Sequence, residues 1–332
     1  MTSHLRKPLI AIGICTRQRN ALLRRLLESI WEQPQPSNFD VTIIIVDNND
    51  APTVSDDVIN LAPKFPILLI HEPQAGLVNA RNRVLDAATD ANVEWLIGVD
   101  DDETVAKDWL KQFIIGIETL DAPIIVAAKK IVYSPDTTPY LEQLQVPQTP
   151  AGEMTVVHST ANFAMQNTVF DPKFGPGLRF AGEMNQIGGE DFELMLRAKY
   201  AYGLKAVKWP YAIATEVSEG TRTSLRYYFK RRMMDQVSRY QVAAMQAKAG
   251  YRGSRARNAM RMLTLTNRFA IFGTGFVLYG IMRRLTGQPN GRVFIGKGIL
   301  SWARALAVFH YLFGLHTPIY GSGVNADRTS AR

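Results

Sequence analysis

The sequence predicts an α/β protein, with a mostly parallel, twisted sheet and flanking helices, followed by a basic helical region at the C-terminal end. Roughly the first 130 residues alternate short apolar runs with runs whose apolar residues recur at helical spacing. Polar or acidic residues directly follow three of the short apolar runs. The expected strands are Leu9–Ile14, Val41–Val46, Ile67–Ile70, Trp95–Val99 and Ile124–Ala128. The expected helices between them are residues 20–31, 77–88 and 107–120.

The individual elements have local signals of their own. Asn20 is the expected N-cap of the first helix, and the prolines at 34 and 36 are expected to end it. Residues 41–46 form a β-branched run that is typical of a central strand covered on both faces. Further along, a long basic amphipathic helix is expected from Ser224 to about Ala247.

Composition narrows the class of protein. The chain has 332 residues, 46% of them hydrophobic, which is enough to bury a sizeable core and excludes wholesale disorder. Cys15 is the only cysteine, so neither an intrachain disulfide nor a thiol cluster for zinc or iron–sulfur binding can form. A reducing, cytosolic environment is expected.

The net charge of +8 is divided unequally along the chain. Residues 1–196 carry 15 Lys and Arg against 26 Asp and Glu, a net charge of −11. Residues 197–332 carry 23 against 4, a net charge of +19. This asymmetry predicts an anionic surface as the partner of the second half.

The polar residues that follow the strands predict the site. Thr16 and Arg17 follow the first expected strand, residues 47–50 (Asp-Asn-Asn-Asp) follow the second, and residues 100–103 (Asp-Asp-Asp-Glu) follow the fourth. In open parallel sheets, ligands bind outside the carboxyl ends of the strands. We therefore expect these side chains to form one site.

Three consecutive carboxylates, Asp100, Asp101 and Asp102, are the strongest candidate for chemistry. They repel one another unless a cation or many hydrogen bonds compensate. Oxygen-only ligands suit Mg²⁺ or Mn²⁺. Proteins often hold these ions with one or two carboxylates, and substrate phosphates supply further ligands. The alternative is a solvated acidic turn before the helix that begins near Lys107.

Two further segments could contribute. In residues 188–191 (Gly-Gly-Glu-Asp), Glu190 and Asp191 occupy the first turn of an expected helix, where a carboxylate can serve as general base. The alternative is plain capping of that helix. Arg81 lies in the expected helix that follows Gly76 and could contribute to the site. The alternative interpretation is that its side chain faces solvent.

Five motifs occur together in the order and rough spacing of the family 2 glycosyltransferases, which this sequence resembles over roughly residues 8–235. The resemblance includes the bacterial enzymes of succinoglycan-type exopolysaccharide assembly, which have a similar Asp-Asp-Asp-Glu and Gly-Gly-Glu-Asp pair. The motifs are Ile14-Cys15-Thr16-Arg17, Val46-Asp47-Asn48, Ala80-Arg81-Asn82, Asp100-Asp101-Asp102 and Gly188-Gly189-Glu190-Asp191.

The resemblance implies the GT-A fold and a role for each matched residue. Thr16 and Arg17 would line the nucleotide pocket, Asp47 would hydrogen-bond the uracil, and Arg81 would contact the base or the diphosphate. This chain departs from the family after Thr16, where relatives often have an aromatic residue and Asn but this chain has Arg17, Gln18 and Arg19.

The same resemblance implies the remaining site residues. Asp100 and Asp101 would hold the ribose, and Asp102 would ligate the metal with Asp100 beside it. Asp191 would be the catalytic base, with Glu190 next to it. Asn162 would contact the donor sugar or the acceptor, and a buried structural hydrogen bond is its alternative.

Two domains are expected. Residues 1–220 would form a glycosyltransferase domain, with a nucleotide-sugar half at about 1–130 and an acceptor half at about 131–220. Residues 221–332 would form a basic amphipathic helical region. Residues 131–153 are rich in Pro, Thr and Gln and are expected to form a loop or lid. Phe269–Met282 and Ile299–Leu315 are apolar but too short or too charged for confident spanning helices. They predict association with the membrane interface. A packed helical subdomain is the alternative, and no nucleic-acid-binding motif is recognised.

Together these features predict an inverting glycosyltransferase that uses Mn²⁺ or Mg²⁺ and a nucleotide-sugar donor. A UDP-sugar is expected, with UDP-glucose as one candidate. The acceptor would be a polyprenyl-diphosphate-linked saccharide, reached from an anionic membrane surface at the cytoplasmic face of the inner membrane, in exopolysaccharide biosynthesis. The alternatives are a non-catalytic sugar-nucleotide-binding scaffold and a nucleotidyltransferase.

Overall fold

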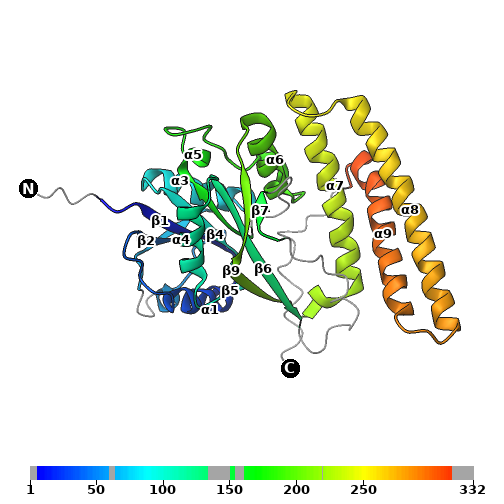
Figure 1. Cartoon of the computed structure of the whole chain (residues 1–332), viewed down its shortest axis with the longest axis horizontal. Helices are drawn as coiled ribbons and strands as arrows, with labels where there is room; N and C mark the ends of the chain where they lie inside the picture. The colour runs from blue at the N-terminus through cyan, green and yellow to red at the C-terminus, as the bar shows by residue number, and fades with distance from the viewer. Residues whose placement is uncertain (1–5, 60–63, 134–149, 154–160, 219, 316–332) are drawn as a thin grey trace, which may run out of the picture. The chain divides into compact units, whose positions relative to one another are not determined.

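The computed structural model describes residues 6–59, 64–133, 150–153, 161–218 and 220–315 (Figure 1). Most of the lid predicted within residues 131–153 lies outside this part of the chain. The chain divides into two compact units. The first comprises Met1–Ile131, Gln148–Asn185 and Glu190–Val217, and the second comprises Val132–Pro147, Gln186–Gly189 and Ser218–Arg332.

The described part of the first unit contains a nine-stranded sheet in the order β3-β2-β1-β4-β8-β6-β9-β5, with β7 paired to β9. Its first four strands are parallel. They are β1 (Leu9–Thr16), β2 (Asp40–Asp47), β3 (Ile67–His71) and β4 (Trp95–Val99). The register places Thr16 opposite Asp47, and Asp47 opposite His71. The predicted polar residues therefore share one edge of the sheet.

The other half of the sheet is antiparallel. The fold class is confirmed, but the predicted strand at residues 124–128 does not extend the parallel half. It pairs antiparallel with β8, which lies between it and β4 and is itself antiparallel to β4. Strand periodicity is the same for both chain directions, so the sequence pattern could not show this reversal. The remaining strands are β5 (Glu103–Val105), β6 (Ile124–Tyr133), β7 (Gly152–Glu153), β8 (Asn162–Gln166) and β9 (Ala206–Ser218).

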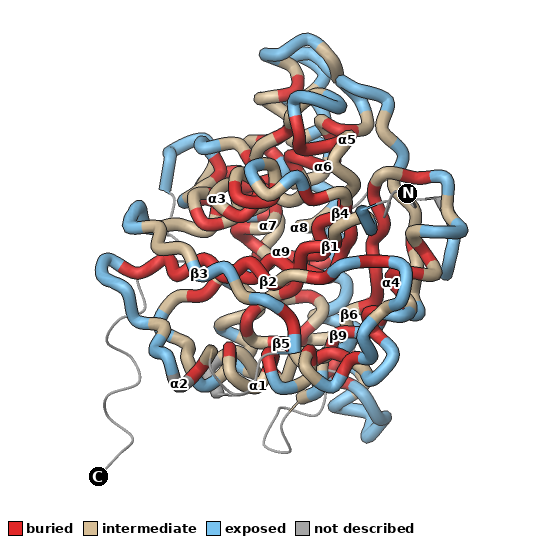
Figure 2. Tube along the Cα trace, turned by 90° about the vertical axis from the view of Figure 1, so that its left-hand side faces the viewer, coloured by how far each residue is buried: buried red, intermediate tan, exposed pale blue. Residues whose placement is uncertain are grey.

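Helices cover both faces of the sheet in the first unit. On one face, Ile10 and Ile12 of β1 pack in the cluster that includes Leu26 of α1 and Phe113 of α4. On the other face, a Cβ at Gly13 would lie 2.6 Å from Val84 of α3, so the glycine permits close packing of this helix. Buried residues run along β1, β2 and β4 (Figure 2). The helices are α1 (Asn20–Trp31), α2 (Asp56–Ile59), α3 (Leu77–Asp90), α4 (Trp109–Thr119), α5 (Asn167–Phe170), the 3₁₀ turn η2 (Gly182–Met184) and α6 (Glu190–Tyr202).

The described residues of the second unit contain three long helices, of which α7 matches the predicted helix at about residues 224–247. Ser224 caps α7 by accepting a hydrogen bond from the backbone N–H of Tyr227, and Gly250 ends it in the left-handed region. A small core joins α7 to α9 through Met234, Val237 and Ala307. The elements are the 3₁₀ turn η3 (Gly220–Thr223), α7 (Leu225–Ala249), α8 (Arg255–Leu285) and α9 (Gly291–Leu312).

Among the helices described, α9 alone is long and apolar enough to cross a membrane by length and composition. Its most apolar window is 44% buried inside the structure. Of the two apolar segments singled out in the sequence, Phe269–Met282 lies within α8, and Ile299–Leu315 begins in α9 and continues past its last residue, Leu312.

Candidate active site

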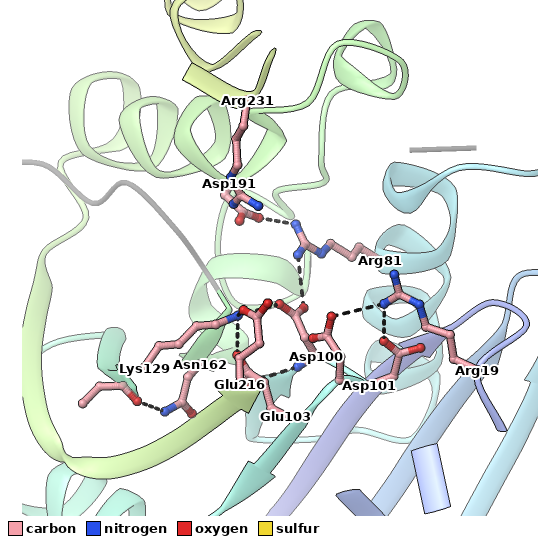
Figure 3. Close-up of polar contacts among 12 residues, drawn as sticks. Arg19, Arg81, Asp100, Asp101, Glu103, Lys129, Asn162, Asp191, Glu216 and Arg231 are labelled. Atoms are coloured by element: carbon pink, nitrogen blue, oxygen red, sulfur yellow. Dashed lines mark hydrogen bonds and ion pairs between the residues drawn. The ribbon is translucent and has the colours of Figure 1, made fainter. Parts of the chain in front are cut away.

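Residues from three of the predicted motifs meet around the guanidinium group of Arg81 (Figure 3). Arg81 lies in α3, Asp100 follows β4, and Glu190 and Asp191 begin α6. Arg81 Nη1 donates to Glu190 Oε1 over 2.7 Å and also to Asp191 Oδ1. Its Nη2 lies 3.6 Å from Asp100 Oδ1. One cation thus connects the acid segment after β4 with the start of α6.

Arg81 is not the solvent-facing arginine that was the alternative. Its side chain is only 13% exposed and lies over the ring of Phe180. Burial alone would lower its pKa, but the charges of Asp191, Glu190 and Asp100 raise the pKa of Arg81 above its already high ordinary value. The guanidinium is therefore a permanent positive charge within the site.

Glu190 and Asp191 have different surroundings. Gly188 and Gly189, both with positive φ, lead the chain into α6. Glu190 is buried, and this burial, together with the charge of Asp191, raises its pKa to about 7 although Arg81 opposes the change. The Asp191 side chain is the more accessible of the two, at 15% against 6% exposed. Asp191 is accordingly better placed to meet a ligand.

The aspartates after β4 are held individually. Asp101 is buried and accepts hydrogen bonds from Thr16 Oγ1 at 2.8 Å and Arg19 Nη1 at 2.9 Å. Burial raises the pKa of Asp101 to about 6, against the opposing charge of Arg19. Asp102 Oδ2 accepts from the same Arg19 nitrogen at 3.3 Å. Burial also raises the pKa of Asp100, whose carboxylate lies between two cations, Arg81 and Lys129.

Arg19 was not predicted as a site residue. The sequence marked residues 17–19 as a departure from the family pattern and assigned a contact only to Arg17. The available signal was electrostatic, since three adjacent carboxylates require nearby positive charge. Arg19 supplies that charge to Asp101 and Asp102 from the N-cap position of α1.

Lys129 was also missed. It lies on β6, and its Nζ is 2.6 Å from Glu103 Oε1 and 2.8 Å from Glu216 Oε2. It is also 3.7 Å from Asp100 Oδ2. Burial raises the pKa of Glu103, whereas the charge of Lys129 opposes that change. Only the antiparallel pairing of β5 and β9 and the position of β6 beside β9 bring these residues together, and the sequence did not predict this pairing.

Asp47 and Arg17 lie apart from the cluster around Arg81. Asp47 is buried and accepts from the backbone N–H groups of Thr53 at 2.6 Å and Val54 at 2.9 Å. Burial alone would raise the pKa of Asp47, but these bonds and those from Asn49 lower the pKa below its ordinary value. Asp47 thus fixes the loop after β2. Arg17 forms a long ion pair, 3.5 Å, with the exposed Asp50.

Asn162 forms buried structural hydrogen bonds. Its amide nitrogen donates to the carbonyl oxygens of Ala128 and Ala212, and its amide oxygen accepts from Trp109 Nε1. The residue is only 3% exposed. These contacts, which connect β8 with β6, β9 and α4, favour the structural alternative over a ligand contact.

The carboxylates after β4 fit a divalent cation by their chemistry. Within the described ranges, no three His, Cys, Asp or Glu side chains converge on a ready-made metal cage. Mg²⁺ and Mn²⁺ sites often use only one or two carboxylates, with substrate phosphates as further ligands. Asp102 and Asp100, 13% and 35% exposed, could provide those two.

Comparison with known proteins finds similarity to glycosyltransferases. Residues 11–173 match the glycosyl transferase family 2 model. The chain is 29% identical over 229 residues to the succinoglycan biosynthesis protein ExoM of Rhizobium meliloti, a match that covers 67% of this chain and 71% of ExoM.

Two solved structures share the fold. The mannosyltransferase PcManGT from Pyrobaculum calidifontis, in complex with GDP-Man and Mn²⁺, matches with a TM-score of 0.59 and 16% identity, over 93% of this chain and 88% of that one. TarS 1–349 of S. aureus, in complex with UDP-GlcNAc, matches with a TM-score of 0.51 and 15% identity, over 92% of each chain. In a longer TarS structure the matched region is 54% of that chain.

Proposed function

We propose that the chain is an inverting glycosyltransferase, because residues 11–173 match the glycosyl transferase family 2 model. It would move a sugar from a nucleotide-sugar donor to a saccharide acceptor. The observation that carries the proposal is the contact of one arginine, Arg81, with the candidate base Asp191 and with Asp100 of the candidate metal segment. A transfer site must bring a base and a phosphate-binding group to the same place.

The donor is proposed to be a UDP-sugar, with UDP-glucose as one candidate. Thr16, Arg17 and Asp47 lie at the carboxyl ends of adjacent parallel strands, where nucleotides bind in such sheets. Because Asp47 holds the loop after β2, its proposed contribution to uracil binding includes shaping that loop.

The leaving diphosphate is proposed to be held by the cationic part of the site. Asp102 and Asp100 would hold Mn²⁺ or Mg²⁺, which offsets the negative charge that develops on the diphosphate. Arg81 would contact the diphosphate or the base, and Arg19 would keep the neighbouring aspartates ionised and oriented. Such preorganised charges stabilise the transition state without having to rearrange during the reaction.

Asp191 is proposed as the general base. It would accept the proton of the acceptor hydroxyl as that oxygen attacks the anomeric carbon. Glu190, which is buried and held by Arg81, would help to orient it. A single displacement assisted by one base inverts the configuration, so an α-linked donor would give a β-linked product.

The acceptor is proposed to be a polyprenyl-diphosphate-linked saccharide at the cytoplasmic face of the inner membrane, in exopolysaccharide assembly. The relative from Rhizobium meliloti is a succinoglycan biosynthesis protein, which supports a role in exopolysaccharide assembly. The net charge of +19 on residues 197–332 supports work at an anionic membrane surface.

The test is a thermal-shift panel of nucleotide sugars with and without Mn²⁺, followed by NMR of the product. We expect stabilisation by one UDP-sugar that depends on Mn²⁺, and a product of inverted configuration. Donor binding without transfer or hydrolysis would favour the scaffold, release of pyrophosphate would favour the nucleotidyltransferase, and retained configuration would contradict the role of Asp191.

A further inference from the structure

Helix α8 is long, but very few of its residues are buried. Of its 31 residues only Gly273 and Gly280 are buried. A helix gains most of its stability in a protein from a packed apolar face. Among the described elements, α8 packs mainly against α9, with a short contact with α7.

Glycines account for how α8 can pack and still expose its large side chains. A Cβ at Gly280 would lie 2.6 Å from the carbonyl oxygen of Gly291, and one at Gly298 would lie 2.6 Å from that of Gly273. The backbones of α8 and α9 therefore approach too closely for larger side chains at these points. Trp302 of α9 packs onto Gly273 in the same contact, so it occupies the room that this glycine leaves.

One exposed stripe on α8 is apolar. Its residues repeat at intervals of seven, four and three, so the stripe lies on a single helical face. Exposure within the stripe ranges from 50% to 84%. The residues are Ile271, Leu278, Met282 and Leu285.

Cations and aromatic rings border this stripe. Arg283 lies over the rings of Tyr279 and Phe294, at 5.6 and 5.7 Å from their centroids. Arg268 lies 5.7 Å from the centroid of Phe272. Aromatic rings paired with arginines suit the boundary between acyl chains and headgroups, where one end of each side chain is apolar and the other polar.

Charge decides which occupant this face fits. Residues 255–312, which span α8 and α9, contain nine Lys and Arg and no Asp or Glu. A second copy of the chain would bring these positive charges together, which is unfavourable. The phosphate headgroups of anionic lipids are complementary to them.

We propose that α8, packed through glycines on α9, lies in the plane of an anionic membrane, with its apolar stripe in contact with the acyl chains. Each arginine near the headgroups adds attraction, and the stripe adds burial of apolar surface. This proposal says which helix of the proposed transferase contacts the membrane. It rests on the proposed function only in assuming that the acceptor is lipid-linked.

The test is binding of the full chain to sucrose-loaded vesicles, measured by co-sedimentation with no donor or acceptor present. We expect binding to phosphatidylcholine vesicles that contain about one third phosphatidylglycerol, and much weaker binding to phosphatidylcholine alone. The triple variant Ile271→Glu/Leu278→Glu/Leu285→Glu should bind at least about tenfold more weakly, since it loses apolar burial and adds repulsion. The variant Arg268→Gln/Arg283→Gln/Arg284→Gln should lose about fivefold for each arginine removed.

The matched control places three glutamates at exposed aromatic positions of the first unit, Phe174→Glu/Tyr202→Glu/Tyr211→Glu. It carries the same change of charge and should bind vesicles like the wild type. Equal binding of the wild type to neutral and anionic vesicles, or an unaffected α8 variant, would overturn the proposal. So would a vesicle-free dimer, seen by light scattering, that the α8 substitutions dissociate. Because no transfer is assayed, these outcomes are distinguishable from failure of the transferase proposal.

Discussion

Arg81 connects the two chemical parts of the site, and Asp191 is the partner whose loss should separate binding from turnover. Asp191→Asn keeps the shape of the side chain but removes the base. We expect turnover to fall by about 10²- to 10⁴-fold, the usual effect of losing a proton-transfer group, with donor affinity little changed. Steady-state kinetics and calorimetry with donor would measure both. Asp121→Asn, at a fully exposed carboxylate, is the control, and an active Asp191→Asn enzyme would remove Asp191 from the mechanism.

Glu190 should make folding stability depend on pH. Its folded-state pKa, about 7, lies above the ordinary value of 4.5 because burial penalises the charged form. Its contribution to stability is therefore fully present below about pH 4.5 and is lost as the pH rises through 7. Glu190→Gln removes the free-energy cost of burying an ionised carboxylate, which is about 3 kcal/mol at most. The melting temperature of the variant should thus fall less between pH 5 and 8, and an unchanged slope would contradict the assignment.

Lys129 compensates two acids, Glu103 and Glu216, on neighbouring parts of the sheet. Lys129→Met would leave the buried Glu103 carboxylate without its cation and should cost about 3–5 kcal/mol of unfolding free energy. Urea denaturation measures the loss. Because the damage is electrostatic, adding Glu103→Gln to Lys129→Met should restore part of the stability. A double variant less stable than Lys129→Met would refute this explanation.

At the scale of elements, the close packing of α8 and α9 can be tested at two glycines of the same helix. Gly280→Ala places a methyl group against the backbone of α9 and should destabilise the second unit, whereas a Cβ at Gly275 meets nothing within 4 Å. Gly275→Ala should stabilise the helix by roughly 0.5–1 kcal/mol, since glycine is a poor helix former. Thermal unfolding followed by circular dichroism compares them. Equal effects would mean that the seam is not tightly packed.

The sequence predicted elements well where one pattern determines them. The register of β1 and β2 brings Thr16 and Asp47 to one edge, as expected from two strands that each end in polar residues. The order and pairing of β5, β6 and β9 were not predictable, because alternation along a strand is the same in parallel and antiparallel sheets. Lys129 was missed for that reason, since its partners lie on β5 and β9. Asn162 was ambiguous because an amide can serve a ligand or the backbone, and only the positions of Ala128 and Ala212 decide.

At the scale of the whole molecule, charge is separated between a chemical site and a docking region, and salt should affect them differently. Exposed charges are screened within about 10 Å at 0.1 M salt and about 3 Å at 1 M. The arginines of α8 are mostly exposed, so salt should weaken their attraction to a membrane. Arg81 is largely buried against Glu190 and Asp191, so salt should disturb it much less.

Raising NaCl from about 0.05 to 0.5 M should therefore release the protein from anionic vesicles while changing donor hydrolysis by less than about threefold. Both are measured on the same sample, by co-sedimentation and by release of the nucleoside diphosphate. Transfer to a lipid-embedded acceptor should follow the membrane-bound fraction, because an acceptor anchored in the bilayer is met only there. If transfer persisted after the protein had left the vesicles, the acceptor would not need the membrane contact, and the charge of the second half would require another partner.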